Sequence, residues 1–249
     1  MTEAFHTAVY DFQQNAYRDP HFCRTGVLRQ DPQITKLCQA LQDIAWIVGG
    51  AARFVCSPQM NLPPAGDVDV FLRQPTSKAR IEAILGELGY QKTSDGRLAS
   101  TWMNATWKRP VQVVLPRTEK HLCSCSENPE DILQKLDFSV CRALLLSPME
   151  ALVDVDFLKD EIGMRLSIKH IVCPLTSVRR IAKYTAKGYK ISMGEILKLF
   201  AEWSERATET ETETAAEVTP TQILQMFTGD ETEFAMKVSD DLLSALYMD

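Results

Sequence analysis

No apolar run in the 249 residues approaches the roughly 18 residues that a membrane-spanning helix needs, so none is expected. The N-terminus carries no basic stretch followed by an apolar one, so we also expect no secretory signal. Walker-type phosphate loops, GxSxG elbows and HExxH helices are missing from the sequence. The seven cysteines are odd in number and scattered. They indicate free thiols in a reducing compartment, and we expect a cytoplasmic protein.

Charge is distributed unevenly along the chain, whose formal net charge is −6. Residues 205–249 hold eleven acidic residues against Arg206 and Lys237, a net charge of −9, which leaves +3 for the first 204 residues. A weakly basic body with an acidic tail does not demand a nucleic acid partner, but it no longer argues against one. At 45% hydrophobic residues, the chain is long enough to bury a sizeable core.

The stretch 46–72, WIVGGAARFVCSPQMNLPPAGDVDVFL, carries the clearest chemical signal. An apolar run ends at Gly49-Gly50, and Asp67-Val68-Asp69 follows within a second apolar run. Side chains alternate along a strand, so Asp67 and Asp69 point to one face and can converge on a hard cation such as Mg²⁺. Paired glycines let the backbone approach a bulky anion such as a triphosphate. The pattern therefore predicts a site for a nucleotide and a metal ion.

Apolar periodicity predicts that strands and helices alternate between residues 45 and 146, which is typical of a mixed sheet covered by helices. The expected strands span 45–48, 67–72, 101–108, 111–115 and 138–146, and the expected helices span 51–56, 77–88 and 129–136, with helical spacing also over 34–44. From about residue 150 the pattern turns helical, with helices over 176–187 and 193–203. The fold class is thus α/β (α+β) with a C-terminal helical region.

The same patterns divide the chain into five predicted segments. They are an N-terminal extension (1–30), a catalytic domain (31–150), a helical region (151–203), an acidic Thr/Glu-rich linker (204–218) and a C-terminal helical segment (219–249).

The order of apolar strand, Gly-Gly, gap and Asp-x-Asp resembles the nucleotidyltransferase superfamily typified by DNA polymerase beta. Further segments resemble its branch found in viral and ankyrin-repeat proteins: GDVDVF, VQVVLPR (111–117), PEDILQKLDFSVCRALL (129–145) and RRIAKYTAKGYKI (179–191). The resemblance covers roughly residues 30–200. It implies a nucleotidyltransferase-like fold, Mg²⁺ with Mn²⁺ as an alternative, and transfer of a nucleoside monophosphate from an NTP to an acceptor hydroxyl. In this chain Ala51 stands where the family often has Ser, and the gap before Asp67 is longer than usual.

A third carboxylate is usual in the two-metal scheme on the neighbouring strand, where this chain has Gln112. An amide is a poorer Mg²⁺ ligand and cannot accept the proton of an attacking hydroxyl. Either Asp137 completes the site, or one metal ion binds strongly, or the enzyme is impaired.

Several other groups have alternative interpretations. Arg53 is predicted to contact a phosphate or to lie in solvent on a short helix. A second Asp-x-Asp, Asp154 and Asp156, lacks a preceding Gly-Gly and is interpreted as structural, at the start of a helix. The run from His121 to Cys125 holds three soft ligands at alternate positions, but no second pair is visible for a zinc site.

The segment 179–187 suggests a basic helical face. Arg180, Lys183, Tyr184 and Lys187 fall at i, i+3, i+4 and i+7, a spacing that puts them on one side of a helix. Cations with one aromatic ring suit a triphosphate and a stacked base, a nucleic acid backbone, or an ordinary solvated face.

Two functions follow from the sequence. The first is a nucleotidyltransferase that uses Asp67, Asp69 and Asp137 for catalysis, with Gly49, Gly50, Arg53 and the basic helix contacting the NTP. The acceptor is an RNA end, a protein or a small molecule. The second is a catalytically impaired scaffold that binds a nucleotide or a partner. In either case the acidic tail is expected to compete for the basic helix.

Overall fold

The computed structural model describes residues 21–96, 99–115, 125–171 and 174–209, and the predictions for 210–249 and for His121 and Cys123 lie outside them. The chain divides between Gly163 and Met164 into two compact units, each described by itself below. Among the described helices, none has both the length and the hydropathy needed to span a bilayer.

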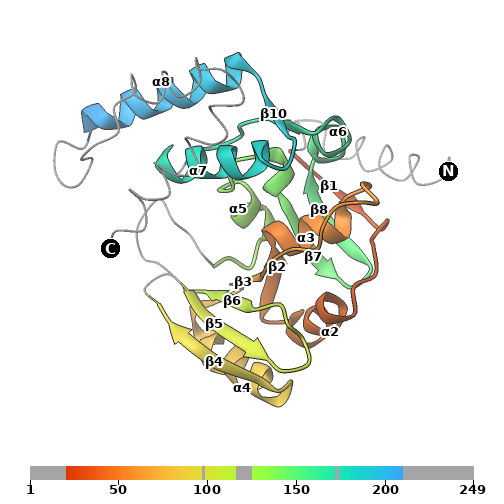
Figure 1. Ribbon diagram of the computed structural model, residues 1–249. Coiled ribbons are helices and arrows are strands. Elements are labelled where there is room, and N and C mark those ends of the chain that lie inside the picture. Colours follow the sequence, from red (N-terminus) through yellow and green to blue (C-terminus); the bar gives the residue numbers. More distant parts are fainter. Residues whose placement is uncertain (1–20, 97–98, 116–124, 172–173, 210–249) are drawn as a thin grey trace, which may run out of the picture. The chain divides into compact units, whose positions relative to one another are not determined.

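The first unit is built on an eight-stranded mixed sheet with the order β1-β8-β7-β2-β3-β6-β5-β4 (Figure 1). Its strands are β1 (Phe22–Thr25), β2 (Ala45–Val48), β3 (Val68–Leu72), β4 (Tyr90–Asp95), β5 (Ala99–Asn104), β6 (Val111–Val114), β7 (Ala143–Ser147) and β8 (Glu150–Asp154). The β3–β6 pair is parallel, while the other neighbours run antiparallel. Its helices are α2 (Pro32–Leu41), α3 (Gly49–Cys56), α4 (Lys78–Glu87), α5 (Pro129–Leu133) and α6 (Phe157–Gly163), with short 3₁₀ turns η2 (Pro75–Ser77) and η3 (Ser139–Cys141). The mixed α/β fold predicted from the sequence is confirmed.

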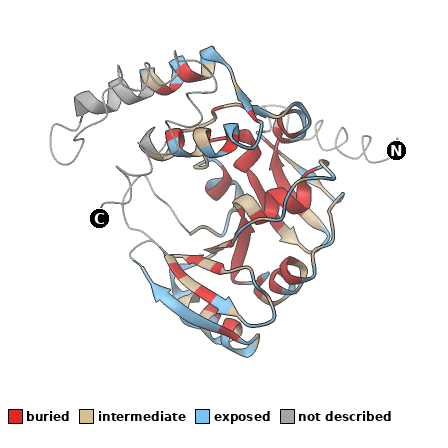
Figure 2. Cartoon of the chain, in the orientation of Figure 1, coloured by how far each residue is buried: buried red, intermediate tan, exposed pale blue. Residues whose placement is uncertain are grey.

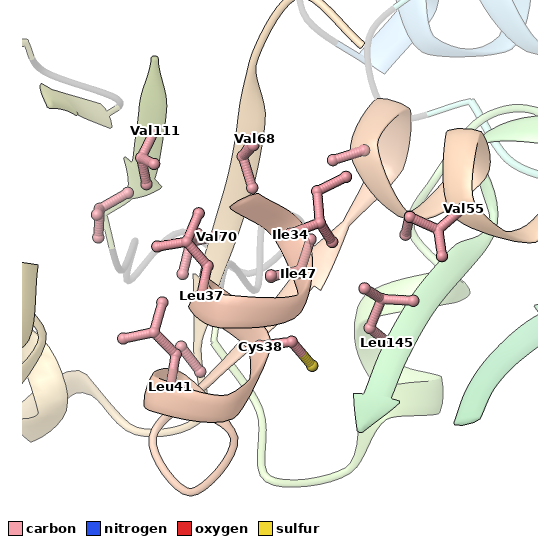
Figure 3. Packing of buried hydrophobic residues seen from close by; sticks show 14 of the residues in the cluster. Ile34, Leu37, Cys38, Leu41, Ile47, Val55, Val68, Val70, Val111 and Leu145 are labelled. Carbon is pink, nitrogen blue, oxygen red and sulfur yellow. The ribbon is translucent and has the colours of Figure 1, made fainter. Parts of the chain in front are cut away.

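Helix α2 shows how the sequence specifies these elements. Asp31 caps it, because its carboxylate accepts the N–H of Ile34 at 3.0 Å, and proline occupies its first turn. The buried stripe Ile34, Leu37, Cys38 and Leu41 packs on one face of the sheet, where it meets Ile47, Val68, Val70 and Val111 (Figure 3).

The two faces of the sheet pack against different partners. Helices α2 and α3 share one core with the inward side chains of β2, β3 and β6. On the opposite face, Trp46 and Val48 pack with Ile132 and Leu133 of α5. Burial is therefore concentrated in the central strands and the helices on them, while β4 is largely exposed (Figure 2). Asp67, just before β3, and Asp69, within it, alternate with the buried Val68 and Val70.

Some expected boundaries are wrong. The predicted strand 138–146 begins as the turn η3 and becomes β7 only at Ala143. The predicted strand 101–108 ends at Asn104, whose side chain accepts the N–H groups of Thr106 and Trp107 and turns the chain. The region from 150 is not wholly helical, because β8 (Glu150–Asp154) joins the sheet between β7 and β1. The first unit accordingly extends to Gly163 and includes β1 and β8, outside the expected limits 31–150.

The second unit contains two helices and a short parallel strand pair. These are α7 (Pro174–Thr185), α8 (Met193–Glu209), β9 (Arg165–Leu166) and β10 (Lys190–Ile191). Helices over 176–187 and 193–203 were expected, and α7 and α8 confirm them.

Candidate active site

Asp67 and Asp69 lie beside the strand ends at which β2 finishes and β3 and β6 begin, and this row of strand ends is called the edge of the sheet below. Asp69 stands opposite Val48 on one side and opposite Gln112 on the other. Directly opposed residues point to the same face. The Nε2 of Gln112 donates to Asp67 Oδ2 at 3.2 Å. The residue predicted at the third carboxylate position therefore does lie beside the two acids, as a hydrogen-bond donor.

The Gly-Gly turn comes close to these acids. Gly49 has φ +67°, a left-handed conformation that favours glycine, and a Cβ added to it would lie 3.3 Å from Asp69 Oδ2. The N-cap residue of α3, Val48, makes no side-chain bond to the N–H groups of the first turn, so these groups and the positive end of the helix dipole suit a phosphate oxygen. Gly50 is half-buried beside Ala65. The structure thus brings together Gly49, Gly50, Asp67 and Asp69.

The loop before β6 sets the position of Gln112. Arg109 Nη2 forms an ion pair with Asp31 at 2.8 Å, and Gln33 Nε2 donates to the Arg109 carbonyl at 2.9 Å. Val68 N donates to the carbonyl of Pro110 at 2.9 Å. These bonds hold β6 beside β3 at this edge, so that the amide of Gln112 reaches Asp67.

The pair of acids suits a hard divalent cation. Both Asp67 and Asp69 are half-exposed, as is Gln112. Protein sites for Mg²⁺ commonly use one or two carboxylates and leave the remaining positions to water and substrate phosphates. In the part of the chain that the structure describes, no group of three or more His, Cys, Asp or Glu side chains could hold a metal ion. The two aspartates fit Mg²⁺ or Mn²⁺ bound together with a nucleotide.

Asp137 has a different environment. It precedes η3 and is 3% exposed, in contrast to the half-exposed Asp67 and Asp69. Burial lowers the pKa of Arg142, while the negative charges of Asp154 and Asp137 act in the opposite direction. Asp137 therefore contributes charge near Arg142, within the buried surroundings of η3.

Arg53 lies in a buried ion pair rather than in solvent. Its Nε donates to Glu161 Oε1 at 2.6 Å, and the two side chains are 5% and 0% exposed. The other oxygen of Glu161 accepts the hydroxyl of Ser57 at 2.7 Å, and Gln59 Nε2 donates to the Glu161 carbonyl. The expected phosphate contact of Arg53 is therefore corrected to an internal contact that ties α3 to α6. The sequence contains no signal for this pairing, because 108 positions separate the partners.

The second Asp-x-Asp is structural, as expected. Asp154, at the end of β8, is 1% exposed and pairs with Arg142 Nη1 at 3.4 Å. Its Oδ1 also accepts the N–H of Asp156 at 3.0 Å, just before α6 begins.

In the second unit, the predicted face of α7 needs one correction. Tyr184 is 8% exposed and packs edge-on against Tyr189, with ring centroids 5.3 Å apart. Lys183 and Lys187 are exposed, and Arg180 is half-buried. Because Tyr184 is buried with Val178 and Ile181, its ring is not exposed for stacking with a base, although Lys187 Nζ lies 5.6 Å from its centroid.

No protein-family model and no curated protein matches the sequence. The structure is similar to a tRNA-processing enzyme in its apo form, with a TM-score of 0.54, 14% identity, and coverage of 86% of this chain and 57% of that chain. It is also similar to the Thermotoga maritima CCA-adding enzyme complexed with tRNA, with a TM-score of 0.52, 13% identity, and coverage of 86% and 52%. A CCA-adding enzyme in complex with CTP gives a TM-score of 0.52, 13% identity, and coverage of 90% and 57%.

The chain therefore spans little more than half the length of these enzymes. The likeness shows that the fold is one found in CCA-adding enzymes.

Proposed function

We propose that this chain is a metal-dependent nucleotidyltransferase that moves a nucleoside monophosphate from an NTP to an acceptor hydroxyl. One observation carries the proposal: the first turn of α3, entered through Gly49, lies against Asp69 while Asp67 and Gln112 flank it at the same edge. The fold shared with CCA-adding enzymes, one of them complexed with CTP, supports a nucleotide substrate. The narrower resemblance to the viral and ankyrin-repeat branch rests on the sequence segments alone.

Each residue has a role that follows from its chemistry. The carboxylates of Asp67 and Asp69 would hold Mg²⁺ or Mn²⁺, which supplies charge neutralisation for the phosphates. The N–H groups at the start of α3 bind phosphate oxygens and orient the chain of phosphates for in-line displacement. Gln112 orients Asp67 by donating to it, but an amide cannot take the proton from the attacking hydroxyl. That proton must pass to a carboxylate or to solvent, so catalysis here depends mostly on positioning.

The test is label transfer by the full chain. The protein is incubated with each α-³²P-labelled NTP and Mg²⁺ or Mn²⁺, with and without total RNA. We expect labelled RNA, protein or a new small molecule, and loss of the label in Asp67→Asn/Asp69→Asn. Asp43→Asn/Asp95→Asn, which removes two exposed carboxylates elsewhere, should retain transfer. Equal transfer by the wild type and Asp67→Asn/Asp69→Asn would refute the proposal.

A binding scaffold without chemistry is the second candidate, and Gln112 favours it. Gln112→Asp supplies the third carboxylate beside Asp69, whereas Gln112→Asn does not. Under the main proposal Gln112→Asp raises transfer at limiting Mg²⁺ by tenfold or more. If Asp137 is the third acid instead, Asp137→Asn abolishes transfer with unchanged unfolding. Metal-dependent NTP binding with no transfer by any variant would identify the scaffold.

A further inference from the structure

The second unit begins with a strongly basic segment. Residues 164–200 contain eight lysines and arginines and a single acid, Glu195, a net charge of +7. The basic residues are Arg165, Lys169, Arg179, Arg180, Lys183, Lys187, Lys190 and Lys198. Across the whole chain acids outnumber bases by 33 to 27, so this segment opposes the general balance. Solvated segments usually carry both signs interspersed, whereas residues 164–200 are almost wholly basic.

Helix α7 displays part of this charge in a line. Arg179 and Lys183 are exposed on it, and Lys187 is exposed just beyond its end. Residues four apart lie on one side of a helix and rise by about 6 Å, so Arg179 and Lys183 follow each other along α7, and Lys187 comes after them in the turn beyond its end.

The opposite side of α7 is fixed by packing. Val178, Ile181 and Tyr184 are buried, and Tyr184 is held edge-on by Tyr189. The Nζ of Lys187 lies 5.6 Å from the centroid of the Tyr184 ring, and its N–H donates to the Tyr184 carbonyl at 2.9 Å. Arg179 and Lys183 are therefore presented by a firmly packed helix, and Lys187 by the turn that follows it.

The single acid of this segment contacts the backbone. One oxygen of Glu195 accepts the N–H of Ile168 at 2.7 Å, which commits the carboxylate to the chain before α7. Over 164–171 and 174–201, no carboxylate pairs with Arg179 or Lys183.

We propose that this face of α7, defined by Arg179, Lys183 and Lys187, binds the phosphodiester backbone of a nucleic acid strand. Cations that follow one another along the chain suit the successive phosphates of a strand better than the compact phosphates of one nucleotide. The inference deepens the proposed function by making a nucleic acid strand the acceptor of the nucleoside monophosphate. Only the role of the strand as an acceptor rests on the proposed function. Strand binding itself is measured without any transfer.

The test uses the full chain and a fluorescein-labelled single-stranded RNA of 20 nucleotides, with a DNA of the same sequence as a second arm. Anisotropy gives the dissociation constant between about 50 and 200 mM salt. The variant Arg179→Gln/Lys183→Gln/Lys187→Gln is compared with Lys36→Gln/Arg80→Gln/Lys159→Gln, which removes three exposed charges from the first unit.

Counterion release predicts the size of the effect. Each phosphate contact on a single strand contributes about 0.7 to the slope of log K against log salt. Loss of three contacts should reduce the slope by about 2 and weaken binding by about 100-fold at 0.1 M salt. The control variant should keep the wild-type slope.

The outcomes separate this proposal from the proposed function. Weaker binding in the α7 variant alone, in either arm, supports it. The arm with the tighter binding identifies the strand as RNA or DNA. Equal weakening in the α7 variant and the control, or no binding of either strand by the wild type, overturns it even if label transfer is observed.

Discussion

The pair of Arg53 and Glu161 offers a direct test of how α3 is held in place. Arg53 lies one turn after Gly49, and Ser57 follows the end of the helix. One carboxylate of α6 therefore contacts two points along α3, with oxygens 2.6 Å from Arg53 Nε and 2.7 Å from Ser57 Oγ. Glu161→Ala removes both contacts and leaves a guanidinium that is 5% exposed without its counter-ion.

The structure sets the expected size of the loss. Removing one partner of a buried ion pair costs about 3–5 kcal/mol, because the remaining charge stays buried without compensation. We expect the free energy of unfolding of Glu161→Ala to fall by that amount, and Tm to fall by roughly 10 °C for a unit of this size. Replacing both partners, in Arg53→Met/Glu161→Leu, should recover part of the loss, since no uncompensated charge remains.

Urea unfolding measures the free energy of unfolding of Glu161→Ala and of the matched control Glu150→Ala. Glu150 pairs with Arg24 at 3.1 Å, but these side chains are 40% and 68% exposed, so we expect a loss of at most about 1 kcal/mol. The m-value should stay unchanged in all variants. The reasoning is refuted if Glu161→Ala loses no more stability than Glu150→Ala, or if the double variant is less stable than Glu161→Ala.

Two further predictions concern single groups near the sheet. Gly49→Ala forces alanine into a left-handed conformation and puts a methyl group 3.3 Å from Asp69 Oδ2. The free energy of unfolding should fall by about 1–2 kcal/mol, and label transfer should fall at least tenfold. The control Gly50→Ala should keep a free energy of unfolding within about 0.5 kcal/mol of the wild type. Burial raises the pKa of Cys38 to about 11 and that of Cys56 to about 12, from an ordinary 9.0. Just above pH 9, therefore, the thiols lose their protons in the unfolded state but keep them in the folded state. The free energy of unfolding consequently falls as the pH rises. From pH 8 to pH 10 the wild type should lose about 3 kcal/mol more than Cys38→Ala/Cys56→Ala in urea unfolding, and equal losses would contradict this assignment.

The central fold was predictable because burial there is periodic. The stripe of α2 repeats at helical spacing, and β3 alternates strictly between buried and half-exposed residues. Strand β4 (Tyr90–Asp95) gave no such signal, since only Tyr90 is buried and the other five residues are exposed. Strand β8 was missed because its apolar residues run directly into Asp154 and the start of α6, which resembles a helix beginning. Tertiary pairing, with β7 and β1, decides that segment.

Some features of the candidate site were likewise predictable from the sequence, and others were not. The opposition of Asp69 and Gln112 was predictable, because both lie on neighbouring strands with alternating side chains. The buried state of Tyr184 was not, since helical spacing places it near Lys187 and Lys183 while packing with Tyr189 turns the ring inward. The partner of Arg53 was equally hidden, because no local pattern relates it to Glu161.

The position of the first turn of α3 thus depends on residues that do not reach the carboxylates. Asp69 and Gly49 are close because β2 and β3 pair in a register that puts Val48 opposite Asp69. That register fixes where α3 starts, but not the direction in which it leaves the sheet. The direction is set by Ala51 and Ala52, which pack against the sheet, and by the contacts of Glu161 with Arg53 and Ser57. A buried charge pair costs free energy to desolvate, so its contribution here is geometric: it ties α3 to α6 at two points and so helps to hold the orientation in which α3 begins against Asp69.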